Sequence, residues 1–222
     1  MAEQILFNCD CQDYMRTLPD KAFDIAIVDP PYGAACDLYN GSSRFSGNGW
    51  NNKIWGEKVQ NWNVNQMPGP DYFVELSRVA KHRIIWGGNY FPLPPSSAWL
   101  VWDKMQREFS LADGELAWTS FNSATRIFSF SRAQAMQSHG KNKFHPTAKP
   151  VELYKWIIKN YCKPGWRIID THAGSASSLI AAYEFGLDYV GCELDPDYYK
   201  AACERVEKHK AQMRLFAPGF DQ

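Results

Sequence analysis

The chain has 222 residues, 45% of them hydrophobic, which is enough for one compact domain with an ordinary core. Its 24 basic and 24 acidic residues cancel, which excludes a strongly basic overall surface, although a local basic patch stays open. The six cysteines form no C-x-x-C pair, so we expect free thiols and no metal site. Without a signal-peptide pattern or an apolar run of about 20 residues, we expect a cytoplasmic protein with no membrane segment.

The first predicted elements are a short strand and an amphipathic helix. Residues 4–8 are apolar in the manner of a strand, and apolar residues then recur at helical spacing from Cys11 to Leu18. Asp10 lies at the junction, where an aspartate commonly caps a helix.

The apolar run 26–28 predicts a buried strand, which Asp29, Pro30 and Pro31 end at once. Two prolines remove two amide donors, so this turn offers only carbonyl acceptors. Asp29 adds a carboxylate acceptor, and Tyr32 adds an aromatic face. The group suits a planar ring with an exocyclic amine, whose lone pair stays directed toward an electrophile.

Asp-Pro-Pro-Tyr after an apolar strand resembles the catalytic motif of the amino-methyltransferases. These enzymes move a methyl group from S-adenosylmethionine to the N6 of adenine or the N4 of cytosine in DNA. The resemblance implies that Asp29, Pro30, Pro31 and Tyr32 are catalytic and that Asp29 also adjoins the cofactor. It further implies that Asp10, within Asn-Cys-Asp-Cys, binds the adenine amino group of the cofactor.

Residues 33–69 show no regular period and are rich in Gly, Asn and aromatic residues. Disordered tracts are poor in aromatic residues, so a functional loop is favoured. Aromatic rings interleaved with Arg44, Lys53 and Lys58 suit a segment that closes over DNA, stacking on bases and touching phosphates.

The middle of the chain alternates strand patterns with turns. Asp71 can cap a helix, and strands are predicted at residues 82–86, 98–102, 115–119 and 126–130. Trp-Gly-Gly-Asn after the first of these strands and Trp-Asp-Lys after the second resemble later blocks of the same family, near the target base.

Residues 131–145 are a short basic segment without an acidic residue. Such a segment is usually a solvated loop, but larger members of the family carry a target-recognition region here. We therefore expect Arg132, Lys141 and Lys143 to contact DNA phosphates.

His-Pro-Thr-x-Lys-Pro at residues 145–150, before a predicted helix, is the second motif of the family. In the family this motif lies against the methionine part of the cofactor. The resemblance therefore implies cofactor contacts for His145 and Thr147, and it places Lys149 near the cofactor carboxylate.

The third motif is a strand at residues 166–170 that runs into a turn of small residues, which lets a backbone approach a ligand closely. Relatives have Asp-Pro-Phe-x-Gly-Ser-Gly-Thr here, so Thr171, His172 and Ala176 depart from the pattern. Glu193 ends the next strand, about 20 residues on, where dinucleotide-type folds hold an acid for ribose hydroxyls. The cofactor contacts expected here are Asp170, His172, Ala173, Gly174, Ser175, Ser177 and Glu193.

The order of these blocks resembles the permuted β class of DNA amino-methyltransferases and covers nearly the whole chain. It implies a single catalytic domain, residues 1–222, with a Rossmann-like α/β fold. Its mixed, mostly parallel sheet would have about seven strands, with helices on both faces.

The expected activity is methyl transfer from S-adenosylmethionine to adenine N6 in double-stranded DNA, in a prokaryotic or phage-encoded protein. Asp at the head of the motif, where many cytosine enzymes have Ser, favours adenine. The alternatives are cytosine N4 as the acceptor, RNA as the substrate, or a non-catalytic cofactor- and nucleic-acid-binding subunit. The sequence leaves open whether the chain forms a homodimer.

Overall fold

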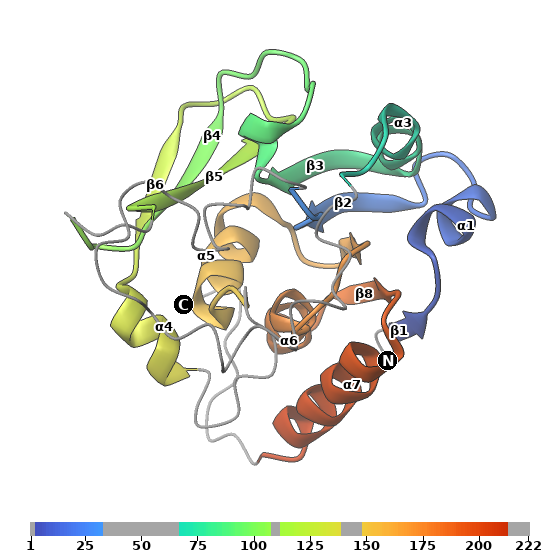
Figure 1. The fold of residues 1–222 in the computed structure, drawn as a ribbon. Coiled ribbons are helices and arrows are strands. Elements are labelled where there is room, and N and C mark those ends of the chain that lie inside the picture. Colours follow the sequence, from blue (N-terminus) through green and yellow to red (C-terminus); the bar gives the residue numbers. More distant parts are fainter. Residues whose placement is uncertain (1–2, 33–66, 108–111, 139–147, 213–222) are drawn as a thin grey trace.

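The computed structural model describes residues 3–32, 67–107, 112–138 and 148–212, which fold around one eight-stranded sheet (Figure 1). The strands are β1 (Gln4–Asn8), β2 (Phe23–Val28), β3 (Ala80–Trp86), β4 (Trp99–Asp103), β5 (Gly114–Thr119), β6 (Arg126–Ser129), β7 (Arg167–Asp170) and β8 (Asp188–Glu193). The helices are α1 (Cys11–Arg16), α3 (Pro70–Val79), the 3-10 turn η2 (Gly88–Tyr90), α4 (Arg132–Ser138), α5 (Val151–Tyr161), α6 (Ser177–Glu184) and α7 (Pro196–Lys210).

The strand order is β1-β8-β7-β2-β3-β5-β4-β6. The five strands from β1 to β3 are mutually parallel, β5 is antiparallel to both β3 and β4, and β6 is parallel to β4. This confirms the predicted mixed, mostly parallel sheet. It has eight strands where the family resemblance implies about seven, and the four-residue strand β6, within the predicted strand 126–130, is the exposed edge beyond β4.

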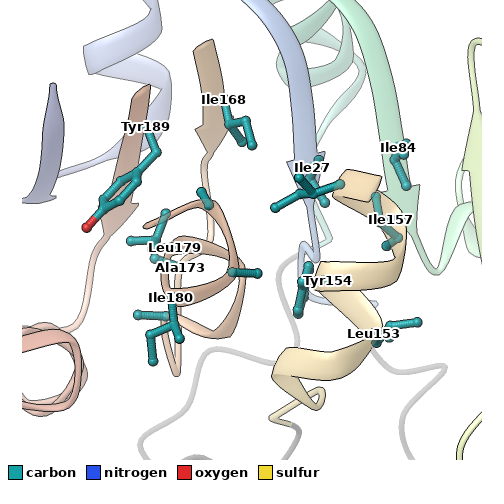
Figure 2. Packing of buried hydrophobic residues seen from close by; sticks show 14 of the residues in the cluster. Ile27, Ile84, Leu153, Tyr154, Ile157, Ile168, Ala173, Leu179, Ile180 and Tyr189 are labelled. Carbon is teal, nitrogen blue, oxygen red and sulfur yellow. The ribbon is translucent and has the colours of Figure 1, made fainter. Parts of the chain in front are cut away.

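Helices cover both faces of the sheet, as predicted. Alternate residues of β2 enter two separate cores: Ile25 and Ile27 pack with α5, α6 and α7, whereas Ala26 and Val28 pack with α1 and α3. A strand buried on both faces explains why residues 23–28 form a nearly continuous apolar run. Figure 2 shows the first core, where α5 and α6 lie against β2, β3 and β7.

Two helix starts follow from their capping residues. The carboxylate of Asp10 accepts hydrogen bonds from the backbone nitrogens of Gln12 and Asp13, and Asp195 caps α7 in the same way ahead of Pro196. Both caps agree with the sequence pattern. No helix among the described residues is both long and apolar enough to cross a membrane.

Several predicted contact residues lie outside the described residues. They are Arg44, Lys53, Lys58, Lys141, Lys143, His145 and Thr147. Part of the basic segment 131–145 is described and forms helix α4 at Arg132–Ser138, where the usual expectation for such a segment is a loop. The backbone nitrogen of Arg132 donates to the carbonyl of Lys104 (3.1 Å), while its contact with DNA stays a prediction.

Candidate active site

The carboxyl ends of four neighbouring strands bring acidic residues from both halves of the sequence to one edge of the sheet. β2 pairs with β7, so Asp29 and Asp170 stand at adjacent strand ends. β8 pairs with β7 and β1, which adds Glu193 and Asp10 to the same edge. Such an edge, where the strand order reverses, is the usual ligand site of open α/β sheets.

Both oxygens of the Asp29 carboxylate are already bound by side chains. The hydroxyl of Tyr32 donates to Oδ1, and the ammonium of Lys149 donates to Oδ2. The Lys149 side chain is only 3% exposed, and its nitrogen also lies 3.3 Å from the Tyr32 hydroxyl. The carboxylate that the motif predicts as an acceptor is therefore bound here by two side chains of the protein itself.

Lys149 bridges Asp29 to a second carboxylate, that of Glu115 at the start of β5. Its nitrogen is 3.1 Å from Glu115 Oε2, and the nitrogen of Lys104 is 2.6 Å from Glu115 Oε1. Burial by itself would raise the pKa of Glu115, but the two ammonium groups outweigh it and lower that pKa to about 2. Burial would lower the pKa of Lys149, yet Asp29 and Glu115 together raise it, so Lys149 is cationic.

The ring of Tyr32 lies in a narrow space beside η2. Gly87 has a positive φ of 67°, and a Cβ at this position would overlap the Tyr32 ring. The ring of Tyr90 stacks on that of Tyr32, with centroids 5.2 Å apart. Tyr90 is 43% exposed, so a second aromatic face is available beside the one that the motif predicts.

On the β1 and β8 side of the site, backbone amides hold the carboxylates. Glu193 Oε2 accepts from the nitrogen of Gly174 (2.8 Å) and Oε1 from that of Asp195 (3.0 Å). Asp10 accepts both of its helix-cap bonds on Oδ1, and its Oδ2 accepts none from the described residues. These acids are fixed in direction and retain acceptor capacity for a ligand.

Asp170 stands between these two regions and is buried. It accepts hydrogen bonds from the Ser178 hydroxyl and from the backbone nitrogen of His172 (3.0 Å). Burial is the largest influence and raises the pKa of Asp170 to about 7, with Asp29 and Glu193 adding repulsion. The carboxyl is therefore partly protonated near neutral pH.

The departures from the family's glycine motif form a hydrogen-bonded chain of their own. The Thr171 hydroxyl lies 2.6 Å from the Tyr72 hydroxyl and 2.9 Å from His172 Nδ1. Burial lowers the pKa of His172 to about 4, so its imidazole is neutral. The neutral imidazole of His172, which packs edge-on against Tyr72, thus occupies the position where the family pattern has phenylalanine.

The rest of the glycine turn is buried and tightly held. Arg205 donates to the Ser175 carbonyl and to the Ser177 hydroxyl (2.9 Å). The nitrogen of Ala173 donates to the carbonyl of Cys192 (2.9 Å), which ties the turn to β8. Ala176 has a left-handed φ of 58°, a conformation that favours the glycine of the family pattern.

Sequence reasoning did not select Glu115, Lys104 or Tyr90. Lys104 belongs to the Trp-Asp-Lys block, and Tyr90 follows Trp-Gly-Gly-Asn, so these two blocks were the available signals. Glu115 has the same strand phase as Ala117 and Thr119, both fully buried. The signal for Glu115 was that a charged residue points to the same side of the strand as buried residues. The buried side of β5, however, is known only once β5 is placed in the sheet.

Comparison with known proteins gives matches over nearly the whole chain. "Putative methylase YubD" of Escherichia coli K12 is 24% identical over 236 residues, which is 96% of this chain and 94% of that protein. The "DNA adenine methyltransferase YhdJ" of Escherichia coli K12 is 31% identical over 81 residues, 36% of this chain and 27% of that protein.

A crystal structure of a "Putative DNA Modification Methylase" from Thermus thermophilus, complexed with S-adenosyl-L-methionine, has the same fold. It has a TM-score of 0.57 at 15% identity, and the match covers 95% of this chain and 96% of the other. Residues 45–204, most of the chain, match the DNA methylase family of N6 and N4 methyltransferases. The chain therefore belongs to this family and is a DNA methyltransferase.

Proposed function

We propose that the chain transfers a methyl group from S-adenosylmethionine to the exocyclic N6 of adenine in double-stranded DNA. The observation that carries the proposal is the position of Asp29 and Tyr32 at the end of β2, directly beside β7 and its glycine turn. A methyl acceptor and a methyl donor held at these adjoining strand ends would meet at the same edge of the sheet.

The residues around the glycine turn fit the proposed cofactor. Glu193 is aimed by two backbone amides and can accept from ribose hydroxyls, while Asp10 Oδ2 can accept from the adenine amine. The small, buried residues Ala173 and Gly174 let a ligand approach the backbone. The bound cofactor supplies an electrophilic methyl group on a sulfonium.

The residues at the end of β2 would prepare the acceptor nitrogen. The target adenine leaves the duplex, stacks on Tyr32, and donates its amine hydrogens to Asp29 and to the Pro30 carbonyl. These hydrogen bonds turn the nitrogen lone pair toward the methyl group, and transfer is direct and in line. The bond from sulfur to the methyl group breaks as the bond to nitrogen forms, so the sulfonium would become a neutral thioether. Lys149 is cationic and cannot take the proton that the amine loses, which would pass along the hydrogen bond to the Asp29 carboxylate and from there to water.

A covalent route through cysteine is disfavoured. Burial raises the pKa of Cys11 to about 12, and that of Cys162 to about 12 as well. A thiol with such a pKa is not a thiolate at neutral pH and is a weak nucleophile. Direct transfer requires no such nucleophile.

The choice of adenine over cytosine rests on two supports. Asp stands at the head of the catalytic motif, and the relative that matches 36% of the chain at 31% identity is named an adenine methyltransferase. The family includes enzymes of both kinds, so cytosine N4 is the competing acceptor.

The test is expression of the chain in a host that lacks DNA methylation, followed by mass spectrometry of the digested DNA. N6-methyladenine is expected with the native chain, and none with Asp29→Ala, the matched control. N4-methylcytosine would overturn the assignment of adenine. Two other results would overturn DNA methylation. In both, the DNA of the host stays unmodified, and the purified chain methylates either RNA or no nucleic acid at all.

A further inference from the structure

In the free protein each oxygen of the Asp29 carboxylate already has a side-chain donor, so a substrate amine has to share the carboxylate with them or displace one. Tyr32 and Lys149 each donate to a different oxygen of its carboxylate. An ammonium and a carboxylate attract each other by their opposite charges, in addition to the hydrogen bond that a neutral amine could also make to the carboxylate. A neutral nucleobase amine would therefore compete poorly with the Lys149 ammonium unless that ammonium had another partner.

Lys149 is the donor that can give way. Tyr32 is three residues from Asp29, and its ring is held by close contact with Gly87 and by stacking with Tyr90. Lys149 has a long side chain, and its nitrogen is already 3.1 Å from Glu115. A small movement would take the ammonium from one carboxylate to the other without leaving it unpaired.

Glu115 is equipped to receive the full charge of Lys149. It is ionised, because the adjacent ammonium groups lower its pKa to about 2 despite its burial. Its other oxygen is held by Lys104 at 2.6 Å, so the carboxylate cannot follow Lys149 toward Asp29. Two carboxylates and two ammonium groups form a neutral cluster in which Lys149 is shared.

We infer that Lys149 stands in for the substrate amine on Asp29 and that Glu115 takes Lys149 over when the nucleobase amine binds. Glu115 and Lys104 are then positioning residues, which act on the acceptor group only through Lys149. This inference rests on the proposed methyl transfer. The inference goes beyond methyl transfer because it gives a role to each of the two carboxylates and two lysines at the site.

The kinetic test is a cycle of Glu115→Gln and Lys149→Met, with methyl incorporation into DNA from a methylation-free host as the readout. In the native background Glu115→Gln leaves Lys149 with Asp29 as its only carboxylate, so kcat should fall by roughly tenfold or more. In the Lys149→Met background the same change should lower kcat less than about threefold, because no competing ammonium remains.

Equal effects of Glu115→Gln in both backgrounds would overturn the inference, as would an unchanged rate in the single variant. The matched control is Glu75→Gln, which removes a carboxylate from an ion pair with Arg78 on α3. It should leave kcat unchanged in both backgrounds. S-adenosylmethionine affinity, measured by calorimetry, should not respond to Glu115→Gln.

A thermal cycle tests the shared lysine without any activity. In Asp29→Asn, Lys149 keeps Glu115, so this variant should lose little Tm. In Glu115→Gln, Lys149 keeps Asp29 but Lys104 loses its carboxylate, and the resulting fall in Tm is common to the single and the double variant. The double variant leaves a buried ammonium without a carboxylate, and its Tm should fall about 5 °C or more below the sum of the single effects. Additive shifts would contradict the sharing of Lys149.

The two cycles separate the inference from the proposed function. A native chain that methylates no nucleic acid would refute the proposed function, while the thermal cycle would still decide whether Lys149 is shared. A native chain that methylates DNA but shows an additive kinetic cycle would refute only the role of Glu115.

Discussion

The acids at the two sides of the candidate site differ in what holds them. Asp10 accepts from backbone amides of its own helix, and Glu193 accepts from the backbone amides of Gly174 in the glycine turn and of Asp195, all of which are part of the main chain. Asp29 accepts from two side chains, one of which, Lys149, comes from 120 residues further along the chain. Backbone amides fix an acceptor, whereas side chains can be exchanged.

This difference suggests a division of labour. The side formed by β1, β8 and the glycine turn can receive a ligand without exchanging its backbone donors. In the inference above, Asp29 exchanges one side-chain donor for the substrate amine. Because the exchange has an energetic cost, the two sides should respond differently to substitution.

The largest effect is expected at Asp29. Asp29→Ala removes the acceptor that orients the amine, so methyl transfer should fall at least about a thousandfold, while the Kd for S-adenosylmethionine should change less than about threefold. Radiolabelled methyl incorporation and calorimetry measure the two quantities. The control is Asp20→Ala, whose carboxylate is exposed beside Arg78. Loss of cofactor binding in Asp29→Ala would contradict the separation of an acceptor side at Asp29 from a cofactor side at β1, β8 and the glycine turn.

The next effect concerns the pH dependence of stability at Asp170. Its pKa is raised to about 7 in the folded chain from an ordinary 3.8, so between these values the folded carboxyl keeps a proton that the unfolded one has lost. The stability that Asp170 contributes is therefore fully present below about pH 4 and falls until about pH 7.

Urea unfolding of the native chain and of Asp170→Asn should show this window. The free energy of unfolding of the native chain relative to the variant should fall by roughly 2 kcal/mol from pH 5 to pH 8. Asp24→Asn is the matched control, because hydrogen bonds and the charge of Lys81 lower the pKa of Asp24 in spite of its burial. Its difference from the native chain should not fall in this range. A flat difference for Asp170→Asn would show that its carboxyl is ionised throughout.

A smaller effect is expected at Glu193. Glu193→Ala should raise the Kd for S-adenosylmethionine about tenfold, because the acceptor aimed by two amides is lost. Glu193→Gln keeps one oxygen acceptor and should raise the Kd less. Calorimetry provides the measurement, and kcat at saturating cofactor should change little. An unchanged Kd in Glu193→Ala would remove Glu193 from the proposed cofactor site.

The smallest effect is expected at Ala176. A left-handed φ costs a residue with a Cβ about 1 kcal/mol. Glycine avoids this cost but loses part of the gain, because its unfolded chain has more conformational freedom. Ala176→Gly should therefore raise the Tm by about 2 °C in a thermal melt. Ala182→Gly, inside α6, should lower it. A lower Tm for Ala176→Gly would show that the Ala176 methyl group contributes more to packing than its backbone strain costs.

Local features of the fold were predictable from sequence, whereas the exchangeable partners of Asp29 were not. Apolar runs such as 23–28 and caps such as Asp10 and Asp195 depend on neighbouring residues. The pairing of Lys149 with Glu115 depends on β5 lying beside β3, which no local pattern specifies. The ring of Tyr90 was missed for the same reason, since its contact with Tyr32 arises from the end of β3.

The close fit of Gly87 under the ring of Tyr32 links two positions that are far apart in sequence. A side chain at 87 would meet both an unfavourable φ and the phenol ring, so it could be accepted only together with a smaller residue at 32. Random mutagenesis selected for retained methylation should therefore recover a side chain at 87 only together with a smaller residue at 32. A directed-evolution library that varies position 87 has to vary position 32 at the same time.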